Sequence, residues 1–124
     1  MNYSSLLILF FTLLFPILGT TQDIQFTDKE KNWIEQHPVI DFGYEPTWEP
    51  YEIYENGVYT GIVGDYVQII EQKTGIDMRP IPDLTWDKTM KGLMNGTIKV
   101  APSCAVTPNR REEFHFTEVY IKDP

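Results

Sequence analysis

The sequence predicts an α/β fold in which a mostly parallel sheet is flanked by helices. Short apolar segments that are typical of strands occupy 39–43, 76–81 and 98–101. Between them, the apolar residues of 62–74 and 86–95 repeat at helical spacing. Strands that alternate with helices generally form a parallel sheet with the helices on its faces.

Residues 1–21 have the layout of a secretory signal peptide. The apolar run from Leu6 to Leu18 would span roughly 20 Å as a helix, less than the ~30 Å hydrocarbon core. Small polar residues follow at 19–21, where cleavage is expected. No Lys or Arg precedes the run and no Ala-x-Ala follows it, so an uncleaved anchor is the alternative. We expect a periplasmic or other extracytoplasmic location.

Charge and cysteine content exclude several classes of function. The net charge is −8, and Glu112-Glu113 directly follow the single dibasic step, Arg110-Arg111, which argues against a nucleic-acid partner. Cys104 is the only cysteine, so an intrachain disulfide is excluded and a thiolate metal site is not expected. The sequence has no metal-ligand spacing, nucleophile–base pair or glycine-rich phosphate loop. We therefore expect no metal, cofactor or catalytic residue.

A lead-in segment, 22–38, contains the first predicted helix. Thr27 and Glu30 have the spacing of a capping box, which places the start of the helix directly after Thr27. The segment ends in His-Pro, and the residue before a proline disfavours helix. We expect Trp33 and Ile34 to face inward and pack.

A first strand over 39–43 follows the lead-in. The next segment, 44–50, holds two prolines and a tryptophan and is predicted to be a loop. Alternating residues in 51–54 and 58–60 flank Asn56-Gly57, a strong signal for a hairpin turn.

The helix over 62–74 precedes Gly75, and the helix over 86–95 precedes Gly96. Glycine is favoured just past a helix end because it adopts the left-handed conformation without steric cost. Between them, 76–81 is predicted to be a core strand.

The C-terminal third predicts a strand at 98–101, a helical turn at 108–113 and a short extended piece at 114–116. The last residues, 118–124, resemble a strand that is cut off in mid-course. A sheet that ends on an unpaired strand is usually incomplete. We therefore expect the fold to be incomplete at its C-terminus.

Five short motifs occur in a specific order. They are Trp48-Glu49-Pro50-Tyr51-Glu52, Gly61-Ile62-Val63-Gly64-Asp65, Trp86 through Leu93 to Gly96, Thr107-Pro108-Asn109-Arg110, and Phe116-Thr117-Glu118-Val119-Tyr120. Together, from Phe26 to Pro124, they resemble the family 3 solute-binding domains, two-lobed proteins that close on a small ligand. The lead-in is similar to those of such domains on membrane-bound sensor kinases and cyclases. The resemblance implies a periplasmic-binding-protein-like fold, with 39–124 as a truncated N-terminal lobe.

The resemblance also implies a ligand site. In relatives, an arginine at the position of Arg110 holds the ligand's α-carboxylate, and a guanidinium fork suits this task. Trp48 and Trp86 are the candidate pocket walls, since an aromatic face offers contact area and attracts an ammonium group. Glu45 is the candidate partner of that ammonium.

Each of these side chains has a structural alternative. The alternatives are a surface ion pair between Arg110 and a neighbouring glutamate, packing of Trp86 under its own helix, and an exposed loop carboxylate at Glu45. Ser103 and Ala105 are expected to contribute mainly backbone groups at a strand end, where ligands bind in open α/β sheets.

Two positions depart from the family pattern. Lys99 stands where relatives often have Asp, and Ala105 stands where a hydroxyl residue is common. One hydrogen bond to the ligand is therefore expected to be missing. The family's second lobe is also absent, so we expect either one part of a longer gene product or a truncated relic.

These observations predict a domain that binds a small polar ligand, with amino acids as one candidate class, for signalling or uptake. A membrane-bound kinase, cyclase or transporter is the expected partner. A non-binding fragment of such a domain is the first alternative. A lyase, dehydratase or peptidoglycan-cleaving relative is the second, since some members of the family have such activities.

Overall fold

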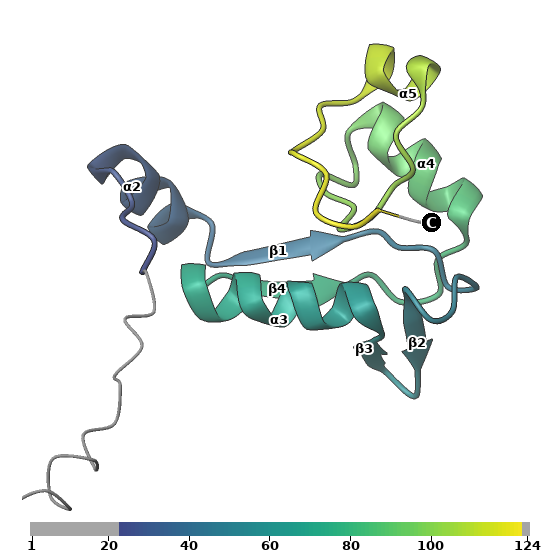
Figure 1. The fold of residues 1–124 in the computed structure, drawn as a ribbon, viewed down its shortest axis with the longest axis horizontal. Helices are drawn as coiled ribbons and strands as arrows, with labels where there is room; N and C mark the ends of the chain where they lie inside the picture. The colour runs from purple at the N-terminus through teal and green to yellow at the C-terminus, as the bar shows by residue number, and fades with distance from the viewer. Residues whose placement is uncertain (1–22, 123–124) are drawn as a thin grey trace, which may run out of the picture.

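The computed structural model describes residues 23–122, so the expected signal peptide lies outside the described residues (Figure 1). Its elements are α2 (Asp28–Gln36), β1 (Val39–Phe42), β2 (Ile53–Glu55), β3 (Val58–Thr60), α3 (Ile62–Thr74), β4 (Asp77–Pro80), α4 (Trp86–Asn95) and α5 (Pro108–Glu113). Within this part of the chain, every helix is too short or too polar to cross a bilayer.

The predicted parallel arrangement is confirmed in the central sheet. β1 pairs with β4 in parallel, with Val39 opposite Asp77 and Phe42 opposite Pro80. In Figure 1, α3 and the β2–β3 hairpin lie on one side of this pair, and α4 and α5 lie on the other. The prediction of an α/β lobe with a parallel sheet between helices is therefore confirmed.

The prediction of a third strand over 98–101 is wrong, because this segment contributes only one bridge, between Phe42 and Val100. Its amino end is bound to α4 and not to the sheet. The Ile98 N–H donates to the Gly92 carbonyl at 3.0 Å, and Ile98 is buried. The chain therefore reaches the edge of β1 only at Val100, whose carbonyl accepts from the Gly43 N–H at 3.0 Å.

Both long helices have the predicted bounds, because local caps fix their ends. Gly75 and Gly96 follow them with φ of 75° and 76°, the left-handed conformation expected of a terminating glycine. The Thr27 capping box of α2 also forms as predicted. In the hairpin, Asn56 and Gly57 both have positive φ, which is the requirement of a type I′ turn.

The core lies between the central sheet, α3 and the hairpin. It consists of the buried residues Phe42, Tyr44, Val63 and Val67. The ring of Tyr59 from β3 packs edge-on against Phe42, with ring centroids 4.9 Å apart. This aromatic packing attaches the hairpin to the end of β1.

Two expectations about the ends of the chain are wrong. Trp33 does not face a core: it is 48% exposed, and no residue of α2 is buried. In Figure 1, α2 stands beyond the amino end of β1, so its apolar side has no neighbouring element, and the Trp33 ring stacks on His37 instead. At the other end, residues 118–122, the described part of the predicted strand, belong to neither sheet of residues 23–122.

Gly92 is required where α4 meets Ile98. A Cβ on residue 92 would lie 2.5 Å from Ile98 Cγ1, whereas a Cβ on Gly64, in α3, would meet nothing closer than 3.5 Å. Glycine to alanine in a helix usually stabilises by about 1 kcal/mol. We expect Gly92→Ala to destabilise instead by about 1–3 kcal/mol through overpacking, and Gly64→Ala to be neutral or stabilising. Urea unfolding followed by circular dichroism measures both, and a Gly92→Ala variant as stable as its parent would contradict this packing.

Candidate functional site

A cavity of about 690 Å³ opens beyond the carboxyl end of β1, where the segment after Val100 meets the C-terminal segment. Such strand ends are the usual ligand sites of α/β sheets. Its lining includes Trp48, Tyr51, Val100, Ser103, Cys104, Ala105, Phe114, Phe116, Val119, Tyr120 and Ile121. Of the predicted site residues, Trp48, Ser103 and Ala105 therefore line the cavity.

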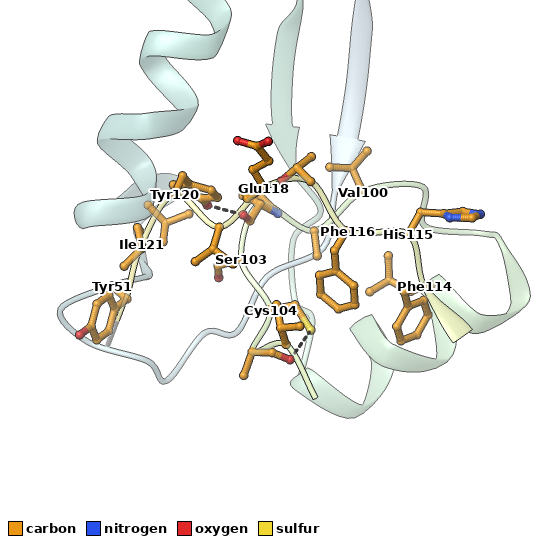
Figure 2. Close-up of a pocket in the computed structure, with 18 of the residues that line it drawn as sticks. Tyr51, Val100, Ser103, Cys104, Phe114, His115, Phe116, Glu118, Tyr120 and Ile121 are labelled. Atoms are coloured by element: carbon orange, nitrogen blue, oxygen red, sulfur yellow. Dashed lines mark hydrogen bonds between the residues drawn. The ribbon is translucent and has the colours of Figure 1, made fainter. Parts of the chain in front are cut away.

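The C-terminal segment forms one wall of this cavity, as Figure 2 shows. Phe114, Phe116 and Ile121 contribute apolar side chains, and His115 is also part of the lining, with its ring directed away from Phe114 and Phe116. The Tyr120 hydroxyl donates to the Pro102 carbonyl, and this bond connects the two walls. The cavity is therefore lined by both kinds of side chain: apolar ones from both walls, and polar or charged ones that include Lys99, Ser103, Glu113 and Glu118.

Arg110 lies beside the cavity and is bound to Ala105, a residue of the cavity lining. Thr107 caps α5 and accepts from the Arg110 N–H at 3.3 Å, which fixes the start of the side chain. One guanidinium nitrogen, Nη1, donates to the Ala105 carbonyl at 3.0 Å. No carboxylate forms a salt bridge with Arg110 in residues 23–122, so the surface pair with a neighbouring glutamate is not formed there.

Trp86 opens α4 and lies under the Arg110 guanidinium, whose carbon is 5.4 Å from the centre of the indole ring. This is the geometry of a cation–π contact. Trp86 is not among the residues that line the cavity. The structure therefore brings Arg110, Trp86 and Ala105 together as one group, in which the indole and the carbonyl orient the guanidinium.

Glu45 is not part of the cavity lining. Its Oε1 accepts from the Thr47 N–H at 3.1 Å and from the Thr47 hydroxyl at 2.7 Å. The carboxylate therefore stabilises the turn that leads to Trp48, whose ring packs against Tyr51 at 5.0 Å between centroids.

Glu52 is the residue that sequence reasoning missed. It is fully buried, and its two oxygens accept from the Tyr59 hydroxyl at 2.6 Å and from the Glu45 N–H at 3.0 Å. Burial raises the pKa of the Glu52 carboxyl, and these bonds and the nearby Ser103 hydroxyl act in the opposite direction. Ser103 Oγ is itself buried and has no hydrogen bond of ordinary geometry among the described residues. The one sequence feature that points to a role for Glu52 is its place at the end of the 48–52 motif.

Cys104, which follows Ser103 in the chain, also lines the cavity. Burial raises the pKa of its thiol, and the positive charge of Arg110 acts against this shift. In the part of the chain that the structure describes, no three His, Cys, Asp or Glu side chains come together as a metal site would require.

Comparisons with known proteins agree with this architecture. Residues 40–124 match the model of the bacterial extracellular solute-binding proteins, family 3. The chain is 30% identical over 102 residues to the sensor protein EvgS of Escherichia coli K12. That match covers 82% of this chain but 8% of EvgS, so the chain spans less than a tenth of that relative.

Solved structures show the same fold. The periplasmic VFT2 domain of Bordetella pertussis BvgS superposes with a TM-score of 0.63 at 21% identity, over 71% of this chain and 38% of that one. The arginine-bound form of domain 1 from TmArgBP superposes with a TM-score of 0.62 at 25% identity, over 73% of this chain and 71% of that one.

The raised pKa of Glu52 has a consequence for stability. The folded chain holds the Glu52 proton to a higher pH than the unfolded chain does, and this tighter proton binding stabilises the fold. The stabilisation is complete below the ordinary pKa of 4.5 and is lost as the pH rises through the raised pKa of the folded chain. Glu52→Gln has a similar shape and does not titrate. We expect the free energy of unfolding of the parent to fall relative to that of Glu52→Gln over this interval.

Urea unfolding at a series of pH values measures this difference. Glu55→Gln, at an exposed position of the hairpin, is the matched control and should follow the parent. Parallel curves for the parent and Glu52→Gln would contradict the buried, perturbed carboxyl.

Proposed function

The chain belongs to the bacterial extracellular solute-binding proteins, family 3, and we propose that it is the N-terminal lobe of an extracytoplasmic domain that binds a small polar ligand. Amino acids are the first ligand class to test, because TmArgBP, with which this chain shares a fold, was solved in an arginine-bound form. The ligand is held between this lobe and a second one.

The observation that carries the proposal is the state of Arg110. Its guanidinium is oriented by the Ala105 carbonyl and the Trp86 ring, and it has no salt bridge among residues 23–122. A positive charge that is held in place without a carboxylate partner suits an anionic ligand group. The ligand carboxylate binds Arg110, and the rest of the ligand lies along Trp48 and the Ser103–Ala105 segment.

The cavity supports a small ligand in size and composition. Its volume of about 690 Å³ falls within the range of ligand pockets, roughly 300–1,000 Å³. Its apolar walls with a few polar groups are also typical of such pockets. The binding step needs only recognition, so the proposed role is not enzymatic.

Signalling is the role that the relatives favour over uptake. The similarity to EvgS extends over 102 residues, and the family match begins at residue 40. The similarity therefore also takes in residues before the lobe, in agreement with the sensor-type lead-in. We propose a membrane-bound kinase as the partner, and uptake through a transporter is the alternative.

A binding experiment tests the role of Arg110. In the complete two-lobed domain, Arg110→Lys keeps the charge but loses the forked geometry. We expect a loss of about 1.5–3 kcal/mol, roughly 10- to 150-fold in affinity, which is the cost of one charge-assisted hydrogen bond. Calorimetry with L-arginine first, and then the other L-amino acids, measures it. Arg111→Lys, at the adjacent exposed position, is the matched control and should bind like the parent.

Trp48→Ala in the same experiment should weaken binding through loss of contact area while the ligand carboxylate stays necessary. The isolated chain should bind more weakly than the two-lobed domain, because an open half-site does not enclose the ligand. Unchanged affinity in both Arg110→Lys and Trp48→Ala would place the site elsewhere. A two-lobed domain that binds no member of the panel would favour a non-binding remnant.

Export is tested separately. We expect residues 1–30, fused to a reporter that is active only in the periplasm, to give an active reporter, because the apolar run from Leu6 to Leu18 directs export. Deletion of 6–18 from the fusion is the control and should abolish activity. A parent fusion whose reporter stays in the cytoplasm would overturn the proposed location.

A further inference from the structure

Glu52 and Thr89 are the two polar side chains that are fully buried among the described residues, each 0% exposed. Both bind the same peptide group. The Thr89 hydroxyl donates to the Tyr44 carbonyl at 3.0 Å, and the Glu45 N–H donates to Glu52 Oε2 at 3.0 Å. The Tyr44 carbonyl and the Glu45 N–H are the two ends of one peptide bond, so the two buried side chains hold it from both ends.

This peptide lies just past the last backbone pairing of β1. The Gly43 N–H still donates to the Val100 carbonyl at 3.0 Å, but two peptides further on, the Tyr44–Glu45 peptide has side-chain partners in place of a strand. Buried backbone groups are nearly always paired, so these two side chains supply what the sheet no longer does. Gly43 permits the contact, because a Cβ there would lie 2.7 Å from Thr89 Cγ2.

The same peptide begins the loop that carries Trp48. Glu52 closes this loop twice: its carboxylate binds the Glu45 N–H, and its own N–H donates to the Trp48 carbonyl at 2.9 Å. The Tyr59 hydroxyl, 2.6 Å from Glu52 Oε1, fixes the carboxylate from the hairpin. The loop between residues 45 and 52 is thus anchored to α4 through Thr89 and to the hairpin through Glu52.

We infer that Thr89 and Glu52 are positioning residues for the candidate ligand site: by holding the Tyr44–Glu45 peptide, they set the place of the loop that carries Trp48 into the cavity wall. Neither side chain lines the cavity, so both act through the loop and not through contact with a ligand. The role in binding rests on the proposed function, whereas the effect on the loop does not.

Hydrogen exchange measured by NMR tests the effect on the loop. Thr89→Val removes the hydroxyl at nearly constant shape and takes no acceptor from any loop amide. We expect the amides of Glu45 and Glu52 to exchange at least about tenfold faster in this variant, relative to the Gly43 amide, which reports on the sheet. Thr89→Ser keeps the hydroxyl and should restore slow exchange. Thr60→Val, at an exposed strand position, is the matched control.

Glu52 is tested by a second pair of variants. Glu52→Met removes both acceptors and should speed exchange of the same loop amides. Glu52→Gln can accept from the Glu45 N–H and donate to the Tyr59 oxygen, so it should keep the loop closed. If exchange of the loop and sheet amides is accelerated equally in Thr89→Val, then Thr89 and Glu52 contribute only to the overall stability of the fold. That result would overturn the inference. If Glu52→Met does not fold, the Thr89 variants decide the outcome alone.

Affinity provides the second readout. In the two-lobed domain, Thr89→Val should weaken binding of the L-amino acid that the parent binds by about 2- to 30-fold, the usual range for residues that act at a distance. Unchanged affinity, together with a loosened loop, would overturn the link between the loop and the ligand. If the parent binds no L-amino acid, the proposed function fails, and the exchange experiment still decides whether the peptide is held.

Discussion

The arrangement of the chain depends on the backbone at Phe42 and Gly43. Phe42 pairs with β4, its carbonyl accepts from the Ile81 N–H at 3.0 Å, and the Gly43 N–H reaches Val100. The Phe42 side chain is fully buried and packs on the hairpin through Tyr59. Three segments that are distant in sequence therefore meet at two residues, and the cavity opens beyond this junction, where the chain continues from Val100. A change there would move the loop, the cavity wall and the hairpin together.

The features that sequence predicted well are those that depend on a few adjacent residues. The bounds of α3 and α4 follow from their terminating glycines, and the start of α2 follows from the reciprocal bonds of Thr27 and Glu30. The family and the parallel α/β fold were also predicted, because several weak motifs in a fixed order identify a known arrangement, and both are confirmed. The grouping of Arg110 with Trp86 and Ala105 was not predicted as such, although each residue was named.

The errors concern contacts between distant segments. The apolar residues of 98–101 match a strand, but the packing of Ile98 against α4 competes with pairing, and only the three-dimensional structure reveals it. Trp33 has a large apolar side chain of the kind found in cores, but it lies on a helix that no other element covers. Glu52 was overlooked because a charged residue is expected at the surface. Its burial becomes understandable only when the Tyr59 hydroxyl and the Glu45 amide are seen beside it.

The burial of the single thiol, Cys104, affects how readily it is oxidised. The thiolate is the form that oxidants and disulfides attack, and burial in the cavity wall raises the thiol pKa and so reduces that form. The half-buried position also limits approach by the cysteine of another molecule. A secreted domain with one unpaired cysteine is at risk of crosslinked dimers and sulfenic acid formation. In the extracytoplasmic location that we propose, the raised thiol pKa and the half-buried position would both slow the oxidation of Cys104.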